Sequence, residues 1–136
     1  MRRITLILPL LGLVGASWAC STDAPSPTGP GPTPVAGPSP VQIALSTTNA
    51  APAVNTCTPL QAILTYNGAN VNGTIVTFRT TLGWFQDNAS TSISVTTQNG
   101  VAAASVCSNV AGPAVVNASA TVGSSFGSAT LTVTFQ

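Results

Sequence analysis

From residue 41 to the last residue, apolar residues alternate with Ser, Thr and Asn in short runs that turn residues separate. Alternation with a period of two is typical of strands that bury one face, and no window here has the 3.6-residue period of a helix. The runs are residues 41–46, 60–66, 74–78, 83–85, 91–97, 101–107, 114–121 and 129–135. About seven short strands predict an all-β, two-sheet sandwich domain over residues 41–136, with a small barrel as the alternative.

Turn sequences divide the strands. Asn67-Gly68 and Asn72-Gly73 enclose a short segment between two runs. Asn99-Gly100 follows the run 91–97 and precedes the run 101–107, and Asn-Gly accepts the positive φ angles of a type I′ turn. We therefore expect these two runs to form a hairpin. The last two runs are expected to join through residues 123–125.

Residues 20–40 have a different composition. Seven of the twenty residues 21–40 are proline, with Gly, Ser and Thr between them. Proline fixes φ and lacks an N–H, so this stretch joins neither a helix nor a central strand. The sequence predicts a disordered, extended tether over 20–40 that precedes the sandwich.

The first 19 residues have the pattern of an export signal. Arg2 and Arg3 precede an apolar run over 4–14, and Ser17 and Ala19 are the small residues of a cleavage site. The apolar run has about 11 residues, whereas a membrane-spanning helix needs about 20. We predict a signal peptide over 1–19, cleavage before Cys20 and an exported protein.

The segment that ends in Ala19-Cys20 resembles the lipobox of bacterial lipoproteins, although Ser17 and Trp18 depart from its usual residues. The resemblance implies that Cys20 carries lipid, that the membrane is a partner through this anchor, and, from Ser21, that the protein is located in the cell envelope at the outer membrane. Lipidation would also dispose of an unpaired exported thiol. The alternative is an ordinary signal peptidase site that leaves Cys20 as a free thiol in a secreted protein.

The sandwich region resembles the group 1 bacterial immunoglobulin-like (Ig-like) domain found in invasin and intimin. Four segments carry the resemblance in order and spacing: residues 72–78, 97–102, 111–118 and 131–135. Asn67 and Asn70 stand where the family often has Asp near the turn after its second strand. The resemblance implies an Ig-like sandwich and names no ligand, because this fold serves as spacer, adhesin and structural module.

Cys57 and Cys107 remain after Cys20 is assigned to the anchor. Cys57 precedes one long strand and Cys107 ends another, so antiparallel pairing of those strands would bring the two residues together. Export favours oxidation, and we expect a Cys57–Cys107 disulfide. Two buried free cysteines are the alternative.

Charged residues make up 4% of the chain, and there is no His. The cations are Arg2, Arg3 and Arg79, so the chain has no Lys either. These absences exclude Ser-His-Asp and Ser-Lys arrangements and Schiff-base chemistry, and they leave no cluster of metal ligands. One cation beyond the signal is too few to bind nucleic acid. We predict a non-enzyme without cofactor, metal or nucleic-acid partner.

Trp84 and Phe85 are the candidate surface-binding residues. As neighbours in a strand they point to opposite faces, and we expect Trp84 to fill the sandwich and Phe85 to cover an edge, or else one of them to be an exposed binding platform.

The sequence leaves two functions open. The domain is displayed for adhesion or for binding a protein or glycan ligand, or it is a self-associating structural or accessory subunit of a surface assembly, because its strands lack charged residues that keep edges apart.

Overall fold

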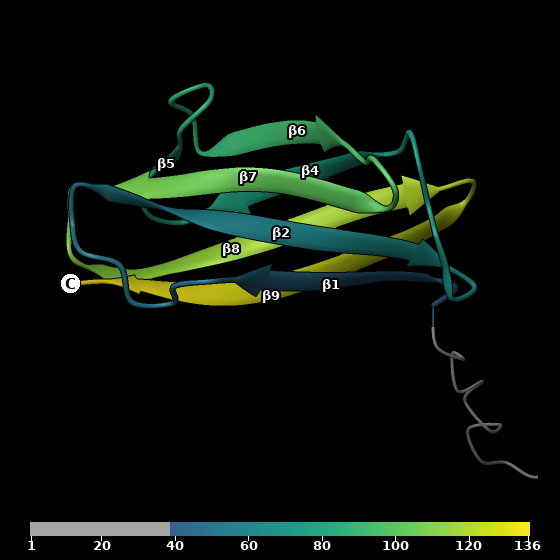
Figure 1. The fold of residues 1–136 in the computed structure, drawn as a ribbon, viewed down its shortest axis with the longest axis horizontal. Coiled ribbons are helices and arrows are strands. Elements are labelled where there is room, and N and C mark those ends of the chain that lie inside the picture. The colour runs from purple at the N-terminus through teal and green to yellow at the C-terminus, as the bar shows by residue number, and fades with distance from the viewer. Residues whose placement is uncertain (1–38) are drawn as a thin grey trace, which may run out of the picture. The chain divides into compact units, whose positions relative to one another are not determined.

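The computed structural model describes residues 39–136 and has nine strands there; eight of them correspond to the alternating runs, and β3 is an additional short strand (Figure 1). The strands are β1 (Val41–Thr47), β2 (Thr56–Tyr66), β3 (Ala69–Asn70), β4 (Ile75–Thr80), β5 (Trp84–Phe85), β6 (Ser92–Thr96), β7 (Val101–Ser108), β8 (Gly112–Val122) and β9 (Ser125–Phe135). The predicted signal peptide, the predicted lipid site at Cys20 and most of the predicted tether lie outside the described residues.

The strands pair into two antiparallel sheets. Sheet A has the order β1-β2-β7-β5, and β3 also pairs with β2. Sheet B has the order β6-β4-β8-β9. The two sheets face each other, and β1 lies along β9 where one edge of sheet A meets an edge of sheet B (Figure 1). The prediction of an all-β two-sheet sandwich is confirmed, and the barrel alternative is wrong.

The core lies between the sheets and comes from the alternation within each strand. In β2, Leu60, Ala62 and Leu64 are buried, and the residues between them face outward. The rings of Phe78 and Phe85 approach within 6.2 Å between centroids at an interplanar angle of 59°. This tilted arrangement is one that aromatic pairs favour. Phe78 from sheet B and Phe85 from sheet A therefore join the two layers.

Strand β2 begins earlier than predicted and runs through Pro59. A proline removes a ladder donor and is normally confined to edges. Here β1 ends at Thr47, which pairs with Leu60. No residue of β1 therefore lies opposite Pro59, and the N–H group that proline lacks is not needed for the β1–β2 ladder. The hydroxyl of Thr47 instead donates to the carbonyl oxygen of Pro59 at 2.7 Å. The strand can therefore continue to Cys57 on its β7 side.

The predicted hairpin of 91–97 with 101–107 is wrong. Asn99 and Gly100 do have φ angles of 52° and 82°, and the bridge between Gln98 and Val101 closes the expected tight turn. Beyond that bridge, however, β6 pairs with β4 in sheet B and β7 pairs with β2 in sheet A. Thr97 is buried, and its backbone N–H donates to Thr74 at 2.8 Å. Pairing with β4 thus holds β6 in the other sheet, and the local turn cannot override it.

The last two strands form a longer hairpin than predicted. Register pairs join β8 and β9 from Gly112 opposite Phe135 to Val122 opposite Ser125. The connection is therefore a two-residue turn, in which Gly123 has a φ of 61°. Within β9, a Cβ on Gly127 would lie 2.6 Å from Cγ1 of Val41. The missing side chain allows β1 to lie close against β9.

Candidate functional site

The structure reverses the expectation for Trp84 and Phe85. Phe85 is fully buried and contacts Phe78, so it is a core residue and cannot be a surface-binding residue. Trp84 is half-buried on the outer face of sheet A. The reason is register: Phe85 pairs with the inward-facing Val106, whereas Trp84 pairs with Cys107. Because directly opposite residues share a face, Trp84 lies beside Cys107 and not inside the sandwich.

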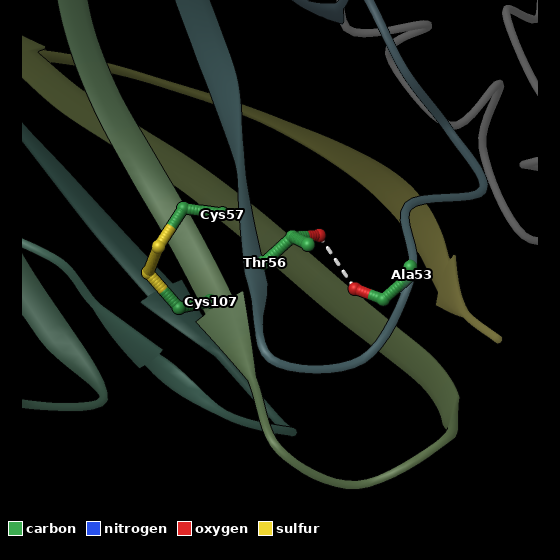
Figure 2. Close-up of a disulfide and its surroundings, with 4 residues drawn as sticks. All are labelled: Ala53, Thr56, Cys57 and Cys107. Carbon is green, nitrogen blue, oxygen red and sulfur yellow. Dashed lines mark hydrogen bonds between the residues drawn. A yellow bond between two sulfur atoms is a disulfide. The ribbon is translucent and has the colours of Figure 1, made fainter.

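Cys57 and Cys107 form the predicted disulfide (Figure 2). The two residues are register partners in β2 and β7, so the bond links adjacent strands of one sheet and does not cross the core. Just before it, the hydroxyl of Thr56 donates to the carbonyl oxygen of Ala53 (Figure 2). The bridge therefore fixes the point at which β2 enters sheet A.

Trp84 extends the disulfide into a row of three side chains across β2, β7 and β5. Gly83, which precedes Trp84, has a φ of 76°, and a Cβ there would overlap the carbonyl oxygen of Cys107. A glycine thus permits the close approach of β5 to β7. This row anchors the two-residue strand β5 to sheet A, so Trp84 has a structural role. Trp84 is consequently a weaker candidate for ligand binding than the surface described next.

A depression of about 490 Å³ lies on the outer face of sheet B. Two large apolar side chains line it: Phe126 in β9 and Ile75 in β4, which are 60% and 59% exposed. Their neighbours Gly127 and Val76 are buried, so the alternation of each strand turns Phe126 and Ile75 outward. An exposed aromatic ring beside an exposed aliphatic side chain forms an apolar platform on this face.

Hydroxyl groups surround the platform. Thr121 is the register partner of Phe126, and Thr77 and Ser119 are partners in the next row. All three line the depression, and no charged side chain does. The hydroxyl of Ser119 lies 3.5 Å from the carbonyl oxygen of Thr77. The depression thus combines one aromatic face with several hydroxyl donors and acceptors, and we call it the Phe126 groove.

The sequence interpretation missed the Phe126 groove because it began the last strand at residue 129 and left Phe126 in a loop. A usable signal was present. Val133 and Phe135 are the strongest apolar residues of this run, and counting back from them by twos reaches Leu131, Ala129 and Gly127. The same parity gives Phe126 to the opposite face together with Ser128 and Thr130. Extending the alternation by four residues would have identified an exposed aromatic residue.

The described residues carry little other chemistry. In residues 39–136 no group of three or more His, Cys, Asp or Glu side chains is arranged to hold a metal ion. Arg79 and Asp87 are the charged side chains of this region, and both are exposed. Among the described residues, no helix has the length and apolar character required to cross a membrane. The Phe126 groove combines an exposed aromatic side chain with hydroxyl groups, which suits it to binding.

A scan against models of protein families finds no match, and a search of curated proteins finds no relative. Among solved structures, the chain is similar to the D0-D1 domain of intimin, with a TM-score of 0.53 and 18% identity over 70% of this chain and 45% of that one. The D00-D0 domain of intimin gives 0.53 and 19% over 68% and 46%. This chain thus spans less than half the length of these intimin fragments.

A third similar structure is a conjugative transposon lipoprotein from Bacteroides eggerthii, with a TM-score of 0.50 and 9% identity over 68% of this chain and 95% of that one. At such identities the likeness concerns the fold alone. Residues 41–136 form an Ig-like sandwich of the kind found in intimin.

Proposed function

We propose that this chain is a non-catalytic lipoprotein of the bacterial cell envelope that displays one Ig-like domain for adhesion or binding. The observation that carries the proposal is the Phe126 groove on the outer face of sheet B. The ligand it suits best is a neutral saccharide on a cell surface or in the envelope.

The chemistry of the groove supports this ligand class. The ring of Phe126 offers an apolar face on which a sugar ring can stack, and Ile75 extends the apolar contact. Thr77, Ser119 and Thr121 offer hydroxyl groups that can exchange hydrogen bonds with sugar hydroxyls. A charged ligand would lose hydration in this groove without gaining a partner of opposite charge. The groove therefore favours an uncharged, hydroxyl-rich ligand.

Several features support display at a membrane. The sequence predicts export, lipid attachment at Cys20 and a Pro-rich tether with a reach of at most about 60 Å, at about 3.1 Å for each residue. A protein of similar fold, from Bacteroides eggerthii, is also a lipoprotein. The Cys57–Cys107 disulfide suits an oxidising compartment. The sequence has no His, and the described residues offer no group of metal ligands, which supports a role without catalysis.

The experiment measures binding of the purified protein to an array of neutral oligosaccharides built from glucose, galactose and N-acetylglucosamine. The test variant is Phe126→Ala, and the matched control is Val110→Ala, which truncates an apolar side chain that is 54% exposed outside the groove. We expect Phe126→Ala to weaken binding at least about fivefold, because loss of a stacking contact removes about 1 kcal/mol or more. Val110→Ala should bind like the wild type.

The saccharide proposal fails if the wild type binds no neutral oligosaccharide, or if Phe126→Ala binds as tightly as Val110→Ala. Both substitutions lie on the surface, so both variants should keep the unfolding midpoint of the wild type. That check separates a lost contact from a lost fold.

A further inference from the structure

The edge strands of the two sheets differ in how far neighbouring segments of the chain cover them. Sheet A ends at β1 and β5, and sheet B ends at β9 and β6. At β9, the hydroxyl of Ser39 donates to the carbonyl oxygen of Phe126 at 3.0 Å. At the other end of β9, the N–H groups of Thr134 and Gln136 donate to Ala50 and Pro52 at 2.8 and 3.0 Å. Neighbouring segments of the chain thus cover both ends of this edge.

Strand β6 has the opposite situation. Its register with β4 places Thr91 opposite Thr80 and Thr97 opposite Thr74, and hydrogen bonds of 3.0 and 2.8 Å join those two pairs. Hydrogen-bonded pairs alternate in an antiparallel ladder, so Ile93 and Val95 also direct their backbone groups toward β4. The backbone N–H and C=O groups of the residues between them point away from the sheet. These residues are Ser92, Ser94 and Thr96.

The outward-pointing backbone groups of Ser92 already have side-chain partners within the chain. The side-chain amide of Asn88 donates to the carbonyl oxygen of Ser92 at 2.8 Å, and the N–H of Ser92 lies 3.4 Å from the hydroxyl of Ser90. Among the described residues, the backbone groups of Ser94 and Thr96 on this side have no backbone partner. Strand β6 therefore presents four free backbone groups in a row.

The β6 edge also lacks the devices that normally prevent strand pairing. Residues 91–97 contain no charged residue, no proline and no glycine, and their β-branched side chains favour an extended chain. Ile93 and Val95 remain only half-buried. Beside them a depression of about 460 Å³ is lined by Val95, Thr96, Gln98, Asn99, Val101 and Ala103. This edge has both free hydrogen-bonding groups and uncovered apolar surface.

We propose that two copies of this chain associate through antiparallel pairing of their β6 strands. In the register that uses all four free groups, Ser94 of each copy pairs with Thr96 of the other, and Val95 faces Val95 across a two-fold axis. The pairing forms four backbone hydrogen bonds and continues sheet B from one copy into the next. The two Val95 side chains then cover apolar surface that is open in the single copy.

A second copy fits this edge better than an unrelated strand. The pairing places hydroxyl-bearing residues opposite each other and valine opposite valine, which is the isologous arrangement of a two-fold dimer. Residues 91–97 themselves carry no charge that could select a foreign partner, and the charged register position beside them, Arg79 opposite Ser92, lies outside the proposed 94–96 pairing. The β6 edge adjoins the Phe126 groove, because Thr96 and Ser94 are the register partners of the groove residues Ile75 and Thr77, and the hydroxyl groups of Thr77 and Ser94 lie 3.2 Å apart. The pairing uses backbone groups of β6 that do not line the groove, so this proposal does not depend on saccharide binding. If the chain is tethered to a membrane, confinement will raise the effective concentration of copies.

The test compares two lysine variants of the full mature chain by sedimentation velocity, from about 10 µM to about 1 mM, a range suited to weak association. Ser94→Lys adds a charge at the β6 edge. Ser128→Lys is the matched control, because Ser128 belongs to the same row of exposed residues on the outer face of sheet B but lies in β9 at the opposite edge. We expect the wild type and Ser128→Lys to form dimers as concentration rises. Ser94→Lys should weaken the association at least about tenfold, since an edge lysine opposes strand pairing.

A cysteine variant tests the register. In Val95→Cys, oxidation should link two copies through residue 95, because the non-hydrogen-bonded pair of an antiparallel ladder brings the side chains close. Val110→Cys, an exposed site away from β6, should give little linked product. A wild type that stays monomeric throughout the range overturns the proposal, as does a Ser94→Lys variant that dimerises like Ser128→Lys. Loss of dimer in Ser94→Lys without linkage in Val95→Cys overturns the register.

Discussion

Replacing both Cys57 and Cys107 by alanine should destabilise the sandwich by about 4 kcal/mol. The disulfide closes a loop of 50 residues in the unfolded chain. In the chain-entropy model, removal of such a cross-link raises the entropy of the unfolded state by an amount worth about 4 kcal/mol. Alanine adds no polar group at the buried Cys107 position, so the change isolates the cross-link. The unfolding equilibrium should shift by about three powers of ten.

Trp84 supplies the assay. The chain has two tryptophans, Trp18 and Trp84, so a protein without residues 1–19 contains Trp84 alone. Because Trp84 is the register partner of Cys107, its fluorescence reports on the same region of sheet A. Urea unfolding followed at Trp84 gives the free energy of unfolding of the double variant, and thermal unfolding should show a midpoint lower by about 15 to 30 °C.

The reduced wild type is the control for this prediction. It lacks the cross-link but keeps both sulfur atoms, so its stability should match that of the double variant. If both proteins unfold within about 1 kcal/mol of the oxidised wild type, the loop-closure argument is wrong for this domain. A large loss in the double variant alone would show that packing of the sulfur atoms, and not the cross-link, stabilises this part of sheet A.

The remaining predictions concern packing. Phe78→Ala should cost about 3–5 kcal/mol because it opens a cavity between the sheets, whereas Phe126→Ala on the surface should change stability by less than about 0.5 kcal/mol, and urea unfolding of both variants measures the difference. Gly83→Ala should destabilise more than Gly68→Ala. Both positions have a positive φ, but a Cβ at Gly83 overlaps the carbonyl oxygen of Cys107 and a Cβ at Gly68 meets nothing within 4 Å. Equal midpoints for the two glycine variants would contradict the close approach of β5 to β7.

The fold was predictable from the sequence because a strand that buries one face has apolar and polar residues in alternation. Runs such as 60–66 and 101–107 appear in the structure as parts of β2 and β7. The disulfide was predictable for the same reason, since it required only that these two strands pair antiparallel. The fold and the disulfide therefore depend on local alternation within each strand and on the antiparallel pairing of β2 with β7.

Features that depend on sheet membership were not predictable. The turn at Asn99-Gly100 is a local feature, whereas β6 pairs with β4 along Ser92–Thr96, a long-range pairing that the sequence of the turn does not indicate. Adjacent residues must face opposite sides, and the sequence contains no rule that gives Phe85 rather than Trp84 to the core. That choice follows from the register of β5 with β7. Phe126 was missed for a different reason: the alternation was followed back only to residue 129, whereas the pairing of β9 with β8 extends to Ser125.

The central proposal is that a lipid anchor holds this chain at a membrane, where it displays an Ig-like domain with an internal disulfide. The most direct test is the intact mass of the protein extracted from membranes, measured with and without reduction. We predict a chain that begins at Cys20 and carries diacylglyceryl and N-acyl groups, with a gain of about 2 Da on reduction of one disulfide. An unlipidated chain found in the soluble fraction would contradict the account, and the domain would then be a secreted subunit without a membrane anchor.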